Sequence, residues 1–175
     1  MPMIGQPAPQ FSTQAVFDGG EIKNISLSDY KGKWTVLFFY PLDFTFVCPT
    51  ELTQFREFLP DFAKANAVIV GASVDSVHSH KRWLRDDLGN LGYPLIADLT
   101  KRISKDFGVL LEDRGIATRG TFIIDPDQNI QYMGIHNTAV GRDAKEVLRV
   151  LQGLQSGELC GAGWKKGDQH VVTLK

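Results

Sequence analysis

The sequence lacks the features that mark secreted, membrane-spanning or nucleic-acid-binding proteins. Its 175 residues include two cysteines, Cys48 and Cys160, too few for a disulfide-stapled scaffold and too far apart for a local Cys-x-x-Cys motif. The chain has 19 basic and 20 acidic residues, so its net charge does not indicate binding to nucleic acid or to a membrane surface. No apolar run approaches the roughly 20 residues that span a bilayer, and the N-terminus has no signal-peptide pattern. We therefore expect a cytoplasmic protein that binds neither nucleic acid nor membranes.

The length and composition are those of one globular domain. Apolar residues make up 43% of the chain, and no repeat or linker divides it. Hydrophobic periodicity and turn residues predict a hairpin at 11–25, a helical turn at 26–32, a buried strand at 34–40, a helix from 48 through 62 and a strand at 67–73. They then predict a helix that is capped by Ser76 or Ser79, carries Trp83, Leu84 and Leu88 and ends near Gly89. A strand at 94–98, a short helix capped by Thr100, a hairpin at 120–135 and a helix at 144–154 complete the chain. This order predicts an α/β fold, a mixed sheet flanked by helices.

The region around Cys48 carries the strongest local pattern. The buried strand 34–40 stops at Pro41, and a helical stripe begins a few residues later. The apolar residues of this stripe are Leu52, Phe55, Leu59 and Phe62. Pro49 lacks the N–H that a helix interior needs, but the first turn of a helix tolerates it. Cys48 is therefore predicted in the first turn of the helix.

This position favours an ionised sulfur. First-turn N–H groups have no backbone partner, and the helix dipole stabilises an anion there by about 1 kcal/mol. A free thiol is mostly protonated at neutral pH, so that contribution alone does not make Cys48 a thiolate. A second source is needed, such as a guanidinium or a hydroxyl donor. Thr45 lies one helical turn before the cysteine.

Residues 40–51, read as YPLDFTFVCPTE, resemble the active-site signature of the peroxiredoxins, with its Pro-x-x-x-Thr-x-x-Cys spacing. The resemblance extends from 5–11 through 119–125 to 157–160 and is strongest to the typical two-Cys branch, which includes the peroxidase subunit of bacterial alkyl hydroperoxide reductase. It implies a thioredoxin-like fold with an N-terminal hairpin extension. It also implies a peroxidase domain at 1–155 and a C-terminal tail at 156–175 that carries the second cysteine.

The resemblance assigns roles to seven residues and names a nearby aromatic. These are Cys48 as the peroxidatic cysteine, Thr45 as its hydroxyl partner, Arg119 as the guanidinium that completes the charge environment, Pro41 as the shield of the sulfur, Glu51 and Arg142 as supporting members of the network, Cys160 as the resolving cysteine, and Trp83 as an aromatic near the pocket. Donors aimed at the departing oxygen of a peroxide act like an oxyanion hole.

The implied reaction reduces hydrogen peroxide and alkyl hydroperoxides. Cys48 becomes a sulfenic acid, which Cys160 of the partner subunit in an antiparallel dimer condenses to a disulfide. Thioredoxin or a dedicated disulfide reductase then recycles the enzyme. The resemblance allows a homodimer or a ring of dimers, and it implies no cofactor. The four histidines, His78, His80, His136 and His170, show no metal-ligand spacing.

Other interpretations stay open from the residues alone. Cys48 can be a buried, inert thiol, Cys160 an incidental thiol in a polar tail, and Arg119 a surface charge. A rival function is a peroxiredoxin-like ring that works as a chaperone or a redox relay, with peroxide as a signal. A thioredoxin-type disulfide reductase is disfavoured, because the chain has no Cys-x-x-Cys pair.

Two departures from the family pattern predict resistance to overoxidation. Sensitive members carry a Gly-Gly-Leu-Gly loop and a C-terminal Tyr-Phe helix that slow unfolding of the cysteine helix. Here the loop reads Gly89-Asn90-Leu91-Gly92, and the chain ends in VVTLK without Tyr-Phe. We expect fast resolution and a robust enzyme. The test is a titration of hydrogen peroxide during turnover, in which inactivation at sub-millimolar peroxide would contradict the prediction.

Overall fold

A computed structural model describes residues 2–172 of the chain. Its main sheet has seven strands in the order β2-β1-β5-β4-β3-β8-β9. These strands are β1 (Ser12–Val16), β2 (Ile22–Ser26), β3 (Trp34–Phe39), β4 (Ala67–Ser73), β5 (Leu95–Ala97), β8 (Arg119–Ile124) and β9 (Ile130–His136). The helices are α1 (Cys48–Glu57), α2 (Leu59–Lys64), α3 (Val77–Trp83), α4 (Arg102–Asp106) and α5 (Ala144–Ser156).

Strand β3 lies inside the sheet between two neighbours of opposite direction. It pairs in parallel with β4 and antiparallel with β8, which confirms the predicted mixed sheet and the strand-helix-strand unit that contains Cys48. Side chains alternate along β3 because successive residues of a strand point to opposite faces. Phe38 joins the core with Cys48 and Phe55, whereas Phe39 joins a second core with Phe107 and Phe122.

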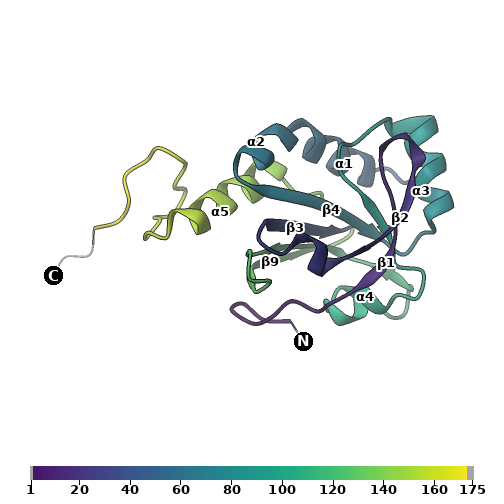
Figure 1. Ribbon diagram of the computed structural model, residues 1–175, viewed down its shortest axis with the longest axis horizontal. Coiled ribbons are helices and arrows are strands. Elements are labelled where there is room, and N and C mark those ends of the chain that lie inside the picture. Colours follow the sequence, from purple (N-terminus) through teal and green to yellow (C-terminus); the bar gives the residue numbers. More distant parts are fainter. Residues whose placement is uncertain (1, 173–175) are drawn as a thin grey trace.

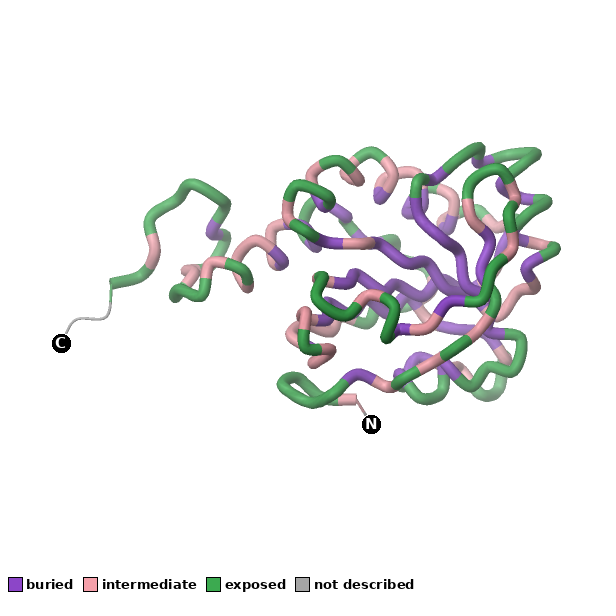
Figure 2. Tube along the Cα trace, viewed as in Figure 1, coloured by how far each residue is buried: buried purple, intermediate pink, exposed green. Residues whose placement is uncertain are grey.

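The two cores lie on opposite faces of the sheet. Helices α1, α2, α3 and α5 contribute to the first core, and α4 contributes to the second. Figure 1 shows α4 on the far side of the sheet from α1 and α2. The buried stretches of the chain follow the strands, and exposed residues gather on the outer sides of the helices and in the loops (Figure 2). The sheet is thus covered on both faces, as the apolar run of β3 requires.

Both predicted hairpins are present. Strands β1 and β2 pair antiparallel around the short 3₁₀ helix η1 (Asp18–Gly20), where Gly19 has φ 74°. Strands β8 and β9 also pair antiparallel. The helical turn predicted at 26–32 is the 3₁₀ helix η2 (Leu27–Tyr30), and Ser76 caps α3 by accepting a hydrogen bond from the Ser79 N–H. The predicted end of that helix near Gly89 is confirmed, because the π-helical turn η3 (Leu84–Leu88) continues α3 as far as Gly89. The π form of this turn and the small pair β6 (Leu110–Leu111) and β7 (Ile116–Ala117) were not predicted.

The helix predicted from 48 through 62 is two helices. The first, α1, ends at Glu57, and Phe58 with φ -90° and ψ 0° separates it from α2. Pro60 explains the break, because a proline ring inside a helix clashes with the carbonyl four residues earlier and cannot donate a hydrogen bond. Leu52, Phe55 and Phe62 still reach the same core, whereas Leu59 is only partly buried.

The short helix α4 is capped by Asp98 and not by Thr100. The Asp98 carboxylate accepts hydrogen bonds from the Ile103 N–H at 3.1 Å and the Ser104 N–H at 2.7 Å. Lys101 adopts a left-handed conformation, with φ 60°, directly before the helix. This turn in the chain brings the buried carboxylate of Asp98 over the free N–H groups of the first turn.

The C-terminal segment begins at the end of α5. Gly157, with φ 69°, ends this helix after Ser156, so the boundary predicted between 155 and 156 falls one residue before the helix ends. Residues 157–172 form neither a helix nor a strand, and they extend away from the sheet beyond α5 (Figure 1). Residues 173–175 of the predicted tail lie outside the described part. Within 2–172, every helix is too short or too polar to cross a bilayer.

Candidate active site

Cys48 is the first residue of α1, as the two prolines predicted. Pro49 occupies the first turn, and Val47 precedes the helix. The chain reaches this point from β3 through the loop 40–47, and Pro41 in this loop is buried. The Cys48 side chain is 1% exposed. Its sulfur therefore lies at the positive end of the α1 dipole and is shielded from bulk water.

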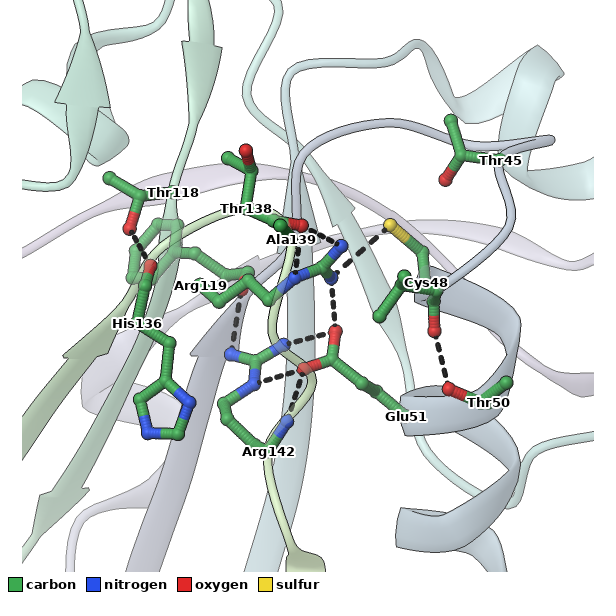
Figure 3. A network of polar contacts seen from close by, with 12 residues as sticks. Thr45, Cys48, Thr50, Glu51, Thr118, Arg119, His136, Thr138, Ala139 and Arg142 are labelled. Carbon is green, nitrogen blue, oxygen red and sulfur yellow. Dashed lines mark hydrogen bonds and ion pairs between the residues drawn. The ribbon is translucent and has the colours of Figure 1, made fainter.

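Arg119 approaches the sulfur from the neighbouring strand β8. Because β8 runs antiparallel to β3 and pairs Thr121 with Phe38, its first residue lies beside the loop that follows β3. The Arg119 Nη1 lies 3.5 Å from the Cys48 Sγ. The Nε and Nη2 groups of the same side chain donate to the Thr138 carbonyl at 2.9 and 2.6 Å, which fixes the guanidinium (Figure 3).

Glu51 joins two arginines beneath the sulfur. One helical turn after Cys48, its Oε2 accepts from the Arg119 Nη1 at 2.5 Å. Arg142, in the loop before α5, donates from Nε to Oε1 at 2.7 Å and from Nη2 to Oε2 at 2.9 Å. The Arg142 Nη1 also donates to the carbonyls of Phe39 and Gly120 at 2.7 and 2.8 Å. The ion pair between Arg142 and Glu51 is therefore bidentate (Figure 3), and both side chains are buried.

The charges of this cluster favour an anion on Cys48. Arg119, Arg142 and Glu51 are at most 7% exposed, and together they carry one net positive charge. A thiolate on Cys48 makes the buried group neutral, whereas a thiol leaves the extra charge uncompensated in a poorly solvated site. Burial lowers the pKa of Arg142, and the hydrogen bonds and charge of Glu51 oppose this shift.

Thr45 does not make the expected hydrogen bond to Cys48. Its hydroxyl donates to the Leu42 carbonyl at 2.9 Å and so closes a turn inside the loop. Figure 3 draws Thr45 near the sulfur, with no bond between the two residues. Phe44 directly before it has φ 55°, an uncommon conformation for a bulky residue. The role of Thr45 therefore stays a prediction.

A shallow hollow lies next to the start of α1. It has a volume of about 470 Å³, and Thr45, Pro49 and Trp83 are among its lining residues. Trp83 is 2% exposed, and its ring lies 5.8 Å from that of Phe44. Trp83 thus forms part of the wall of this hollow, and its place near a peroxide pocket stays a prediction.

A second buried network holds the loop and was missed from the sequence. The Asp43 carboxylate accepts from the Tyr40 hydroxyl at 2.9 Å and contacts the His80 Nδ1 at 2.9 Å, and the Asp43 N–H donates to Asp75 at 2.9 Å. Burial, followed by the charge of Asp43, raises the pKa of Tyr40 well above its usual value. Nothing in the local sequence signals that Asp43 and His80 meet, because they lie on different elements.

Cys160 does not lie near Cys48 within one chain. It is half-buried in the segment after α5, where its sulfur contacts Ser156 and His170. Of the predicted site residues, the structure brings Cys48, Glu51, Arg119 and Arg142 together and places Thr45 near the sulfur (Figure 3). Pro41 is buried in the loop that leads to Cys48. Within residues 2–172, no three His, Cys, Asp or Glu side chains are placed to hold a metal ion.

Known proteins resemble this chain over nearly its full length. The family model described as the AhpC/TSA family matches residues 4–133. Peroxiredoxin prdx-2 of Caenorhabditis elegans is 51% identical over 96% of this chain and 88% of that protein, and the chloroplastic 2-Cys peroxiredoxin BAS1 of Hordeum vulgare is 52% identical over 98% and 86%.

The solved structures that this chain resembles are also peroxiredoxins. The reduced 2-Cys peroxiredoxin of Plasmodium vivax matches with a TM-score of 0.92 and 36% identity over 95% of this chain and 91% of that one. The AhpC of Mycobacterium tuberculosis matches with a TM-score of 0.86 and 38% identity over 94% and 99%. A cysteine at a helix start beside a buried arginine, in a sheet of this topology, fits these matches. The chain belongs to the AhpC/TSA family and is a 2-Cys peroxiredoxin, a thiol-dependent peroxidase.

Proposed function

We propose that Cys48 is the peroxidatic cysteine of this peroxidase. Its thiolate attacks one oxygen of hydrogen peroxide or an alkyl hydroperoxide, the O–O bond breaks, and hydroxide or alkoxide leaves. Cys48 then carries a sulfenic acid. The observation that carries this assignment is the Arg119 Nη1 at 3.5 Å from the Cys48 Sγ, within a buried cluster of net positive charge.

The surrounding residues have separable roles in this proposal. Arg119 stabilises the thiolate and the charge that develops on the departing oxygen, as donors in an oxyanion hole do. Glu51 and Arg142 hold the Arg119 guanidinium in place. Pro41 shields the sulfur from water, and Thr45, which lines the hollow beside the start of α1, is the hydroxyl partner of the reacting sulfur. Relatives named as peroxiredoxins favour this enzyme over a chaperone or a redox relay.

We propose that Cys160 of a partner subunit resolves the sulfenic acid. Within one chain, Cys160 belongs to a segment that extends away from the sheet, whereas Cys48 packs in the core (Figure 1). Strand β9 forms one edge of the sheet, and an edge strand can pair with the same strand of a second copy. An antiparallel dimer, alone or in a ring of dimers, brings the second cysteine to the first.

Recycling of the disulfide requires an external dithiol. Thiol-disulfide exchange with thioredoxin or a dedicated disulfide reductase returns both cysteines to their thiols. A thioredoxin-like reductant operates in a reducing compartment, which agrees with the cytoplasm predicted from the sequence.

Non-reducing electrophoresis after one equivalent of hydrogen peroxide tests the proposal. We expect a dimer-sized band that disappears with dithiothreitol, because the new disulfide joins two subunits. The Cys48→Ser and Cys160→Ser variants serve as matched controls, and each should lack the band. A monomer-sized disulfide species would overturn the assignment of the partner subunit. A wild-type-like dimer band from the Cys160→Ser variant would overturn the role of Cys160.

A further inference from the structure

The segment after α5 is a closed loop with its own small core. The Val171 N–H donates to the Leu159 carbonyl at 2.8 Å, which ties the two ends of 159–171 together. Trp164 is 6% exposed, and its ring stacks on His170 with centroids 5.2 Å apart and planes inclined by 25°. Compact loops with close ends and internal packing are a recognised surface structure. The loop therefore holds Cys160 and His170 side by side.

The loop is also attached to α5. The Arg149 Nη1 donates to the Trp164 carbonyl at 2.9 Å, and Gly153 of the same helix lies against the Cys160 sulfur and the Trp164 ring. An added Cβ at Gly153 would lie 3.6 Å from the Cys160 Sγ. The helix and the loop thus give the sulfur a defined environment.

Four polar groups surround the Cys160 sulfur. They are the Ser156 Oγ at 3.5 Å, the Glu158 carbonyl at 3.7 Å, the Gly153 carbonyl at 3.8 Å and the His170 Nδ1 at 3.8 Å. Carbonyl oxygens and a serine hydroxyl do not accept a proton near neutral pH. An imidazole nitrogen does. Of these four groups, His170 is the one that can remove the thiol proton.

We propose that His170 is the general base that activates Cys160 for disulfide formation. The inference rests on the proposed function, in which Cys160 is the resolving cysteine. The Cys160 S–H proton passes to the His170 Nδ1, and the resulting thiolate attacks the Cys48 sulfenic sulfur of the partner subunit. An S–S bond forms, the Cys48 S–O bond breaks, and the departing hydroxide takes a proton to become water. No outside oxidant or reductant takes part in this step.

The charged groups around the loop are compatible with this role. Arg149 of α5 forms an ion pair with Glu146 at 2.6 Å. The Glu146 hydrogen bond raises the pKa of Arg149. Asp168 accepts a hydrogen bond from the Lys165 N–H at 2.8 Å within the loop.

The test measures the disulfide-forming step alone, in a single turnover of the full-length protein. Reduced enzyme is mixed with one equivalent of hydrogen peroxide, and samples quenched over time are resolved by non-reducing electrophoresis. A free cysteine is roughly 3% thiolate at pH 7, so loss of the base can slow this step by at most about thirtyfold. We expect His170→Gln to slow it by about tenfold or more. His78→Gln, at an exposed histidine of α3, is the matched control and should match the wild type.

A pH profile separates a base from a structural role. The wild-type rate should level off above about pH 7, whereas the His170→Gln rate should keep rising toward about pH 8.5, where a free thiol ionises. Added imidazole should partly restore the rate of His170→Ala. The oxidation rate of Cys48 should be unchanged in all variants, which shows that they are folded.

Two results would overturn the inference while the proposed function stands. One is a His170→Gln variant as fast as the wild type at pH 7. The other is the same loss at every pH without rescue by imidazole, which indicates that His170 only packs the loop. If the wild type itself forms no disulfide between Cys48 and Cys160, the proposed function fails, and the inference fails with it.

Discussion

Replacing Arg119 with methionine should slow the reaction of Cys48 with hydrogen peroxide by about a hundredfold to a thousandfold, the usual effect of removing one preorganised donor from a developing anion. Methionine has a similar length and no charge. The substitution removes the cation 3.5 Å from the sulfur and leaves the Glu51 carboxylate without its Arg119 partner. The buried cluster then loses the positive charge that a thiolate neutralises. Stopped-flow measurement of the second-order rate constant checks this prediction.

Three further variants provide comparisons for the rate of Arg119→Met. Cys48→Ser gives the rate without the reacting sulfur, and Arg102→Met, at an arginine on α4 whose side chain is 84% exposed, should match the wild type. Arg119→Lys keeps the charge but loses the forked geometry, so an intermediate rate is expected. A rate for Arg119→Met within twofold of the wild type would show that the helix start alone activates Cys48.

Replacing Arg142 with methionine should produce the largest loss of stability among the charged residues. Arg142 makes two bonds to the Glu51 carboxylate from its guanidinium and two more to the carbonyls of Phe39 and Gly120. Breaking a buried ion pair by removing one partner costs about 3–5 kcal/mol, because the remaining charge is left unpaired. For a domain of this size, we expect the melting temperature to fall by about 6–20 °C.

The matched control for this stability prediction is Arg102→Met. Arg102 also forms an ion pair, with Asp106 at 3.6 Å, but the two side chains are 84% and 44% exposed. Ion pairs exposed to water contribute about 0–1 kcal/mol. Thermal unfolding of both variants, followed by circular dichroism, compares the same substitution in a buried and an exposed pair. Equal losses of thermal stability in the two variants would contradict the interpretation that the buried Glu51 carboxylate needs Arg142 as its ion-pair partner.

The sequence predicted the features that depend on neighbouring residues. Pro41 and Pro49 are local signals, and they located Cys48 at the start of a helix. The apolar run at 34–40 predicted a strand buried on both faces, and β3 is such a strand. Pro60 was an equally local signal for the break between α1 and α2, but the regular apolar stripe across it hid the break.

Features that depend on folding could not be derived from spacing. Glu51 on α1, Arg119 on β8 and Arg142 before α5 lie far apart in the chain and meet only in the folded protein. Their link therefore came from the family resemblance and not from a pattern. Thr45 was expected to contact Cys48 from its spacing, yet the turn at Phe44 directs its hydroxyl to the Leu42 carbonyl. His170 meets Cys160 only because the loop 159–171 closes on itself.

The antiparallel pairing of β8 with β3 also determines where this chain tolerates changes in length. Arg119 lies two positions before Thr121, which pairs with Phe38. A single residue inserted or deleted within β8 would shift its register and turn every following or preceding side chain to the opposite face of the sheet. The guanidinium would then leave the sulfur. Insertions in the exposed stretch 112–114, before β8 begins, leave that register intact, so length variation among natural homologues is expected to concentrate there.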